Sequence, residues 1–340
     1  MVNTIQPVRM LIAGCGFACR KIHASRINAL GDHYQVVAVA DPVEQNAIEA
    51  SQLFHCEAVF RDVETMLHAV DAEAMVILTP IHANLVRAGL EHNLDLFVEK
   101  PFCETPLQSS EMAALADVKG RIVQVGAMRV YDPAVEYARS HLETIGPVRW
   151  VEIHDYCGQS LTSGSGGSMI ARTFQSALPM PEGQPRNGLQ TMLLEFIHDI
   201  SILRGVFGLP LACRSSLLAP DGWSAAGVVD LPGDIPCLFG TTEYGLPKIN
   251  LFEVQMTIYG ENGLLRANFG DANVPGGGET VVELANGEKK GFHQDVFLDE
   301  WKSFYQAVRD RKLPKNSAQD GAADVILGWE IVETALRNKG

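Results

Sequence analysis

The feature that most constrains the fold is an alternation of short apolar runs and helical stretches between Val8 and Ala127. The apolar runs are continuous and do not alternate with polar residues, so each predicts a strand that is buried on both faces. Five such runs occur: VRMLIAG, YQVVAVADP, AMVILTP, LDLFVEKP and RIVQVGA. Because strands separated by helices pair in parallel, the pattern predicts a doubly wound parallel sheet, whose ligands bind beyond the carboxyl ends of the strands.

A glycine-containing turn follows the first run. In AGCGFAC, Gly14 and Gly16 occupy the first two positions of the pattern G-x-G-x-x-G, and Cys19 stands at the third. The first glycine permits a tight turn, and the second lets backbone N–H groups approach a pyrophosphate. Because the turn follows a strand and opens a helix, it predicts a dinucleotide site that continues through Phe17 and Ala18. The alternative is a degenerate turn that binds nothing.

Two acidic positions follow later strands of the predicted sheet. The second run ends in Asp41, where a carboxylate accepts hydrogen bonds from a ribose 2′-hydroxyl and repels a 2′-phosphate. This favours NAD(H) over NADP(H), unless Asp41 only caps a turn with Pro42. The fourth run ends in Glu99 and Lys100, followed by proline.

Lys100 lies at the edge of the sheet where ligands are expected. A lysine there carries charge beside a substrate hydroxyl or anchors the nicotinamide ribose, with Glu99 holding it in place. A desolvated lysine amine also exchanges protons near neutrality. The alternative is a surface ion pair that caps the strand.

A single histidine, His198, lies in the mostly apolar run LLEFIHDIS. Histidines in apolar helical runs are more often buried core residues with a satisfied hydrogen bond than catalytic groups. An imidazole titrates near neutrality, however, and therefore also suits a proton-transfer role. Both interpretations stay open on this run alone.

After Arg129 the pattern changes. Short strand-like runs at regular spacing predict a mostly antiparallel sheet, followed by two helices at the end of the chain. Two stretches rich in glycine, serine or proline, 158–168 and 178–188, are predicted to be loops, and the segment 158–188 is expected to shape the substrate pocket. The length of 340 residues suggests two domains, with a dinucleotide-binding domain over 1–127 and a second domain over 128–340.

Composition argues against several classes of protein. No apolar run is long enough to span a membrane, and the N-terminus does not have the pattern of a signal peptide. A net charge of −14 disfavours nucleic acid as a partner. Seven scattered cysteines without a C-x-x-C pair fit the reducing cytoplasm. Pairs such as His154 and Cys157 have no third or fourth metal-ligating residue at a suitable spacing, so no metal is expected.

Together these motifs resemble the Gfo/Idh/MocA oxidoreductase family over nearly the whole chain. The similar segments are LIAGCGFAC, VVAVADP, ILTPIHANLVRAGLEHN, FVEKPFCET, VGAMRVYDPAVEYARSHLETIGPV, FIHDISILRGVFG, YGENGLLRANF and the C-terminal stretch that begins with DEWKSFYQAVRD. The triplet E-K-P is the most specific of them. The resemblance implies an N-terminal Rossmann domain and a C-terminal α/β domain whose large, mostly antiparallel sheet often forms an oligomer interface. A homodimer or homotetramer is therefore expected, as is a nicotinamide cofactor that acts on sugars, inositols or related polyols.

The resemblance also implies roles for individual residues. Lys100 matches the family lysine that contacts both nicotinamide and substrate, and His198 matches the histidine near the reacting hydroxyl. Thr79 and Pro80 match a cofactor-lining turn. Residues expected on the substrate side are Met128, Arg129 and Asp155.

The chain departs from the family pattern around His198. An acidic residue is common four positions before the histidine and an aspartate three positions after it, but Leu194 and Ser201 stand there. In an α-helix Glu195 lies about 60° around the axis from His198, so it is a candidate replacement for the missing acid. His23 falls one residue later than the usual family histidine, and it receives no role.

The leading hypothesis is hydride transfer between NAD(H) and one carbon of a sugar or polyol, with His198 as base and Lys100 orienting the hydroxyl. One alternative is a redox-neutral elimination or epimerisation with tightly bound NAD. Another is a dinucleotide-binding regulator that lacks catalysis, which the leucine at position 194 favours. The particular sugar, the reacting carbon and the direction of reaction are not encoded in these motifs.

Overall fold

The structure is a computed structural model that describes residues 6–157, 172–180, 184–242, 252–274 and 276–338. The chain forms two compact units: Met1–Gly126 with Phe297–Ala322, and Ala127–Val296 with Ala323–Gly340. The sequence pattern placed every residue after 127 in the second domain. The segment Phe297–Ala322 instead belongs to the first unit, because the aromatic side chains of helix α10 (Val296–Asp310) pack in its core.

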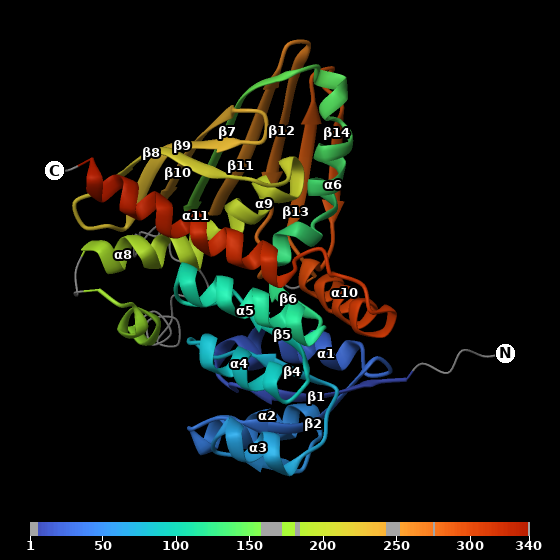
Figure 1. The fold of residues 1–340 in the computed structure, drawn as a ribbon. Helices are drawn as coiled ribbons and strands as arrows, with labels where there is room; N and C mark the ends of the chain where they lie inside the picture. Colours follow the sequence, from blue (N-terminus) through green and yellow to red (C-terminus); the bar gives the residue numbers. More distant parts are fainter. Residues whose placement is uncertain (1–5, 158–171, 181–183, 243–251, 275, 339–340) are drawn as a thin grey trace. The chain divides into compact units, whose positions relative to one another are not determined.

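The first unit contains a six-stranded parallel sheet in the order β3-β2-β1-β4-β5-β6 (Figure 1). Its strands are β1 (Val8–Ala13), β2 (Tyr34–Ala40), β3 (Ala58–Phe60), β4 (Ala74–Ile77), β5 (Asp95–Glu99) and β6 (Val123–Gly126). The doubly wound sheet predicted from the apolar runs is confirmed. The additional strand β3 has three residues, which is too short for a periodic signal.

Helices cover both faces of this sheet. They are the π-helical segment η1 (Ala18–His23), α1 (Ala24–Ala29), α2 (Glu44–Phe54), α3 (Val63–Ala69), α4 (Ala83–Glu91), α5 (Pro106–Lys119) and α10. On one face, Met10, Ile12 and Phe97 share a core with residues of α1, α2 and α10. On the other, Gly89 of α4 lies so close to Met75 and Leu96 that a Cβ would approach their side chains to 2.7 Å. Burial on both faces explains the continuous apolar runs.

The second unit contains an eight-stranded sheet in the order β14-β13-β12-β11-β7-β10-β9-β8. Its strands are β7 (Val148–Cys157), β8 (Ala212–Leu218), β9 (Ser224–Leu231), β10 (Ile235–Thr242), β11 (Phe252–Gly260), β12 (Gly263–Phe269), β13 (Glu279–Leu284) and β14 (Lys289–His293). Only the pairing of β7 with β10 is parallel, so the prediction of a mostly antiparallel sheet is confirmed.

The described helical elements of the second unit are η2 (Met128–Tyr131), α6 (Pro133–Ser140), η3 (Leu142–Ile145), α8 (Gln184–Gln190), the π-helical η4 (Thr191–Phe196) and α9 (Ile197–Phe207), together with a short helical stretch at 172–177. The final helix, α11 (Ala318–Arg337), contains the boundary between the units. The predicted loop at 178–188 is wrong from Gln184 onward. Pro185 is tolerated there because the first turn of a helix does not need its N–H. The predicted loop at 158–168 lies outside the described residues.

The two faces of the second sheet differ in exposure. Phe239 of β10 is buried and packs against Phe196, with ring centroids 5.0 Å apart, so η4 covers that face. Successive residues of a strand point to opposite sides of the sheet, and residues paired between strands point to the same side. The pairing therefore places Leu217, Leu238 and Tyr156 on the side opposite Phe239, and they are 66%, 42% and 37% exposed. We call this side of the sheet the open face.

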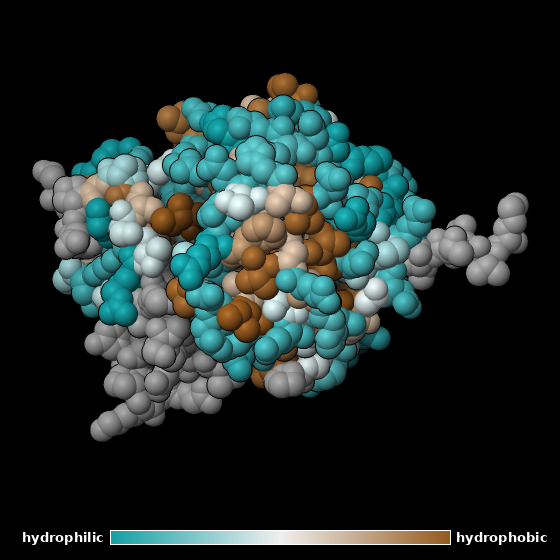
Figure 2. Space-filling view, turned by 90° about the horizontal axis from the view of Figure 1, so that it is seen from below, coloured by the Kyte–Doolittle hydropathy of each residue, from teal (hydrophilic) through white to brown (hydrophobic). Residues whose placement is uncertain are grey.

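The surface seen from below is largely hydrophilic, with apolar side chains gathered near its centre (Figure 2). Exposed apolar residues of the first unit include Val43, Ile48, Leu53 and Val59, which belong to or adjoin α2 and the edge strand β3. Within the described part of the chain, no helix has the length and apolar character that crossing a membrane requires.

Candidate active site

The glycine turn connects β1 to η1. Gly14 has φ of +91°, and a Cβ there would come within 2.9 Å of the Leu78 backbone and 2.8 Å of the Thr79 side chain. A glycine is therefore required by both the backbone conformation and the close packing. Gly16 differs, because a Cβ on it would meet no atom within 4 Å. The space beside Gly16 is open, and no side chain caps the start of η1 at Phe17.

Asp41 follows β2 and holds two turns together. Its Oδ2 accepts the backbone N–H of Cys15 at 2.8 Å, and its Oδ1 accepts the N–H of Val43 at 2.8 Å and the amide of Asn46 at 3.3 Å. Asp41 therefore caps turns through its carboxylate, as one of the two interpretations of the sequence predicts. A carboxylate offers about four lone-pair positions, so one remains for a ribose hydroxyl. The almost buried carboxylate also opposes a 2′-phosphate.

The turns after β4 and β5 are joined by a histidine that the motifs did not single out. The ring of His82 lies with Nδ1 2.6 Å from the carbonyl oxygen of Pro101 and Nε2 2.5 Å from that of Thr79. Its backbone N–H donates to the buried carboxylate of Glu104. His82 therefore connects the turn that contains Thr79 and Pro80 with the turn that follows Lys100.

Glu99 and Lys100 end β5. The Glu99 Oε2 accepts the backbone N–H of Lys100 at 2.9 Å, and its Oε1 lies 2.8 Å from Nε2 of the fully buried His23. Burial alone raises the pKa of the Glu99 carboxyl, but the hydrogen bond from His23 and the nearby charge of Lys100 outweigh burial and lower it. Glu99 is therefore a held, charged carboxylate. Its partner His23, which received no role from the sequence, belongs to the site.

A second carboxyl group lies buried near Glu99. Glu300 of α10 is completely buried, and neither of its carboxyl oxygens has a hydrogen-bond partner among the described residues. Burial and, second, the negative charge of Glu99 raise the pKa of Glu300 well above its usual value. Of these two acids, Glu99 carries the charge and Glu300 keeps its proton.

In the second unit, His198 lies at the start of α9, directly after the π-helical η4. The α-helical spacing assumed for this run is wrong up to Phe196, because i→i+5 hydrogen bonds widen the turn. Between Thr191 and Arg204, only Leu194, Glu195 and His198 are partly exposed to solvent. Ser201 is buried, and its hydroxyl donates a hydrogen bond to the backbone carbonyl of His198 at 2.6 Å. Glu195 therefore shares the accessible side of the helix with His198.

Beneath His198 the second unit buries a pair of aspartates. Asp155 points to the inner face of the sheet, and Asp199 of α9 is completely buried. Burial and then the charge of Asp155 raise the pKa of Asp199 well above its usual value, while the positive charge of Arg129 opposes this effect. The guanidinium of Arg129 lies 4.0 Å from Asp132 and about 5.7 Å from the Phe252 ring centroid. Met128 and Arg129 are both buried in η2.

The structure thus brings the cofactor candidates together at one edge of the first sheet. The glycine turn, Asp41, Thr79, Pro80, Glu99 and Lys100 all follow the carboxyl ends of β1, β2, β4 and β5. Sequence reasoning missed His23 and His82. The available signal was that His23 ends the helical segment after β1 and His82 lies in the turn after β4, since ligand-binding residues cluster in the connections that follow the strands.

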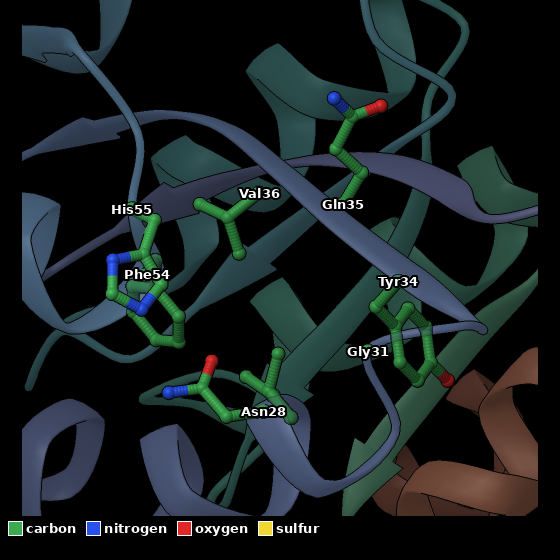
Figure 3. Close-up of a pocket in the computed structure, with 8 residues that line it drawn as sticks. Asn28, Gly31, Tyr34, Gln35, Val36, Phe54 and His55 are labelled. Carbon is green, nitrogen blue, oxygen red and sulfur yellow. The ribbon is translucent and has the colours of Figure 1, made fainter.

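A cavity of about 340 Å³ lies elsewhere in the first unit (Figure 3). It is lined by Ile27, Asn28, Gly31, Tyr34, Gln35, Val36, Phe54 and His55. Tyr34 begins β2, so the cavity adjoins the amino end of that strand and not the edge that carries the glycine turn. Among the described residues, no group of three histidine, cysteine, aspartate or glutamate side chains is arranged to hold a metal ion.

Comparison with known proteins agrees with this architecture. Residues 8–127 match the family described as "Oxidoreductase family, NAD-binding Rossmann fold" (GFO_IDH_MocA). Inositol 2-dehydrogenase 4 of Saccharopolyspora erythraea is 36% identical over 121 residues, which cover 34% of this chain and 35% of that protein. Inositol 2-dehydrogenase of Streptomyces avermitilis is 25% identical over 319 residues, or 89% of this chain and 85% of that protein.

The similarity to solved structures extends over both units. The scyllo-inositol dehydrogenase of Lactobacillus casei, solved with bound NAD(H) and scyllo-inositol, has a TM-score of 0.74 at 18% identity and covers 98% of each chain. At this identity the likeness shows the fold. The first unit is therefore a Rossmann domain of the NAD-binding class. Residues 8–127 match the NAD-binding Rossmann domain of the Gfo/Idh/MocA oxidoreductase family, which supports the resemblance stated from the motifs.

Proposed function

We propose that this protein is a dehydrogenase that transfers a hydride between NAD(H) and a hydroxyl-bearing carbon of a sugar, inositol or related polyol. The observation that supports it most directly is Lys100 at the carboxyl end of β5, on the same sheet edge as the glycine turn of an NAD-binding family. The substrate class is supported by the inositol dehydrogenases among the relatives.

The residues at the sheet edge fit the cofactor. Gly14 and Gly16 shape a turn with open space beside the second glycine, which suits close approach of a pyrophosphate. Phe17 and Ala18 begin the helix whose N–H groups face that space, and Asp41 keeps one acceptor position for the ribose. Thr79, Pro80 and Glu99 complete the proposed cofactor-binding set. NADP(H) fits less well because its 2′-phosphate would meet the Asp41 carboxylate.

Two side chains are assigned the chemistry. As the family resemblance implies, His198 is assigned the role of the base that takes the hydroxyl proton, and Lys100 the role of a hydrogen-bond donor to a substrate oxygen. NAD⁺, when bound, would supply the hydride acceptor. Met128, Arg129, Asp155 and Glu195 are proposed for the substrate side. Glu195 orients His198 in place of the acid that Leu194 does not supply.

The test is a screen of inositols, sugars and other polyols with NAD⁺, in which NADH formation is followed by absorbance. On an active substrate, we expect His198→Ala to lower kcat by roughly 10²- to 10⁴-fold, as loss of a general base does. Lys100→Ala should lower it by roughly 10²- to 10³-fold, as loss of a donor to a developing oxyanion does. Exposed His68→Ala and Lys312→Ala serve as matched controls and should keep wild-type turnover.

Near wild-type turnover in either site variant would refute the assigned roles. Substrate conversion without net NADH, in a protein purified with NAD bound, would instead establish redox-neutral elimination or epimerisation. Tight NAD binding without turnover on the whole panel would establish a regulator.

The cytoplasm is the proposed compartment, which six free cysteine thiols among the described residues support. The open face of the second sheet, which carries Leu217, Leu238 and Tyr156, is the proposed contact of a homodimer or homotetramer.

A further inference from the structure

A chain of three hydrogen bonds leads from helix α10 to Lys100. The indole Nε1 of Trp301 donates to Nδ1 of His23 at 3.1 Å, and Nε2 of His23 lies 2.8 Å from Oε1 of Glu99. The other oxygen of Glu99 accepts the backbone N–H of Lys100 at 2.9 Å. All four residues belong to the first unit, although Trp301 and His23 are 278 positions apart in the sequence.

The direction of these hydrogen bonds is fixed by chemistry. An indole N–H can only donate, so Nδ1 of His23 must accept from Trp301 and carries no hydrogen. The hydrogen is therefore on Nε2, which donates to Glu99. The ionised Glu99 carboxylate, which can only accept, requires the same tautomer, so both partners hold the ring in one orientation. Without the indole N–H, the buried Nδ1 would lose its donor and the ring would be held by Glu99 alone.

Packing holds the first two members of this chain in place. The Trp301 ring stacks on Phe97 of β5 with centroids 4.3 Å apart and an interplanar angle of 15°. The His23 ring contacts Phe97, Phe297 and Trp301 edge to face, with centroid distances of 5.6, 6.1 and 5.6 Å. Tyr34 donates its hydroxyl to the Trp301 carbonyl at 2.5 Å. Both rings are fully buried, so neither can exchange its partner for water.

The hydrogen bonds also determine which of the two buried acids is ionised. Glu99 receives two N–H donors, whereas the Glu300 carboxyl receives none from the described residues. The negative charge therefore stays on the glutamate next to Lys100, and Glu300 beside it is an uncharged acid.

We propose that Trp301 and His23 are positioning residues for Lys100. Trp301 holds the His23 ring at Nδ1, His23 holds Glu99, and Glu99 accepts from the backbone N–H of Lys100 and so fixes the backbone from which the lysine side chain extends. The role of the lysine in hydride transfer rests on the proposed function above. The positioning itself is a property of the first unit that can be measured without turnover.

The variant Trp301→Phe removes the indole N–H and keeps an aromatic ring to stack on Phe97. We expect amide hydrogen exchange at Lys100 to accelerate about tenfold, as loss of a buried hydrogen bond implies, while exchange at Val98 within β5 stays unchanged. Nitrogen-15 imidazole spectra should show His23 as the Nε2–H tautomer in the wild type, and the Nδ1 resonance should shift in the variant because that nitrogen loses its hydrogen bond. Trp150→Phe is a matched control, because it removes an indole hydrogen bond to Glu152 of 3.1 Å in the other unit.

Turnover provides the second measurement. In Trp301→Phe, kcat should fall about tenfold with KM for NAD⁺ changed less than about twofold, since cofactor contacts are retained. His23→Leu, which removes both hydrogen bonds, should lower kcat further. His23→Gln should recover most of it, because an amide can accept from Trp301 and donate to Glu99. Trp150→Phe should leave kcat and Lys100 exchange at wild-type values.

Unchanged exchange at Lys100 and an unchanged His23 Nδ1 resonance in Trp301→Phe would overturn the proposal. The link to catalysis would be overturned if exchange changed while kcat on an active substrate did not, or if Trp150→Phe lost as much kcat as Trp301→Phe. If the wild type oxidises no polyol, the proposed function fails, and the exchange and imidazole measurements alone decide whether Trp301 and His23 position Lys100.

Discussion

Each unit of the molecule buries two carboxyl groups whose charges interact, and the two pairs are stabilised differently. In the first unit, Glu99 is ionised because His23 and the Lys100 backbone donate to it, while neighbouring Glu300 has a raised pKa. In the second, Asp199 has a raised pKa beside Asp155, and the opposing influence is the positive charge of Arg129. Hydrogen bonds to Glu99 together with the nearby charge of Lys100 compensate the first pair, and the charge of the buried Arg129 opposes the shift in the second.

This difference has consequences for substitution. Hydrogen bonds from fixed donors determine geometry as well as charge, whereas a guanidinium acts on every acid nearby. Arg129 lies near Asp132, which also caps α6 by accepting the Ala134 N–H at 2.9 Å and accepts the Thr280 hydroxyl at 2.8 Å. The second unit should therefore depend strongly on one cation.

The largest effect is expected when that cation is removed. Arg129→Met leaves Asp132, Asp155 and Asp199 buried without the guanidinium, and we expect a loss of about 3–5 kcal/mol in the free energy of unfolding, as for a broken buried ion pair. Urea denaturation of the variant and of Arg139→Met, an exposed control on α6, measures it. A loss no greater than that of the control would mean that the acids of the second unit do not depend on Arg129.

A smaller, pH-dependent effect is expected in the first unit for Glu300→Gln. The folded state keeps the Glu300 proton as the pH rises above about 4.3, the usual pKa of glutamate, whereas the unfolded state releases it. Stability of the wild type therefore falls with rising pH in this window, and the glutamine variant, which cannot titrate, avoids that loss.

We expect Glu300→Gln to match the wild type near pH 4 and to be more stable by on the order of 1 kcal/mol at neutral pH. Thermal unfolding from pH 4 to 8 measures the difference. If the stability difference between Glu300→Gln and the wild type does not grow with pH, Glu300 is ionised in the folded protein.

The smallest effect is expected for Asp199→Asn. This variant should also gain stability over the wild type as the pH rises, because Asp199 keeps its proton in the folded state above the usual pKa of aspartate. The gain should be less than that of Glu300→Gln, since Arg129 favours the charged form of Asp199. The same pH series measures it, and a larger gain than that of Glu300→Gln would contradict the assignment of Arg129 as the compensating charge.

Much of the first unit was predictable from local patterns. Five of its six strands, the glycine turn and the ends of β2, β4 and β5 follow from apolar runs and punctuating residues. The strand β3 and the helix α3 were not predicted, because short elements give too few residues for a period. The placement of Phe297–Ala322 in the first unit depends on contacts with distant residues that no window of sequence contains.

The second unit shows where local reasoning fails. The antiparallel strands were recognisable, but the start of α8 was taken for a loop because it contains Pro185 and Gly188. The π-helical turn before His198 is not predicted by α-helical periodicity, and it places Glu195 and His198 on one accessible side. Hydrogen-bond register within a helix is decided by the packing of its sides and not by its residue spacing alone.

The sequence by itself determined the alternation that makes a parallel sheet, the glycine turn that fits a dinucleotide, and the resemblance to a family of NAD-binding oxidoreductases. It also marked Lys100 and His198 as the residues to test. Only the tertiary structure decided that Glu99 is held by His23, that His23 is oriented by Trp301, and that Glu300 lies buried nearby. The reason is physical: strand and helix periodicity is a local property of the chain, whereas the partners of a buried charge are chosen by the folding of distant segments into one core.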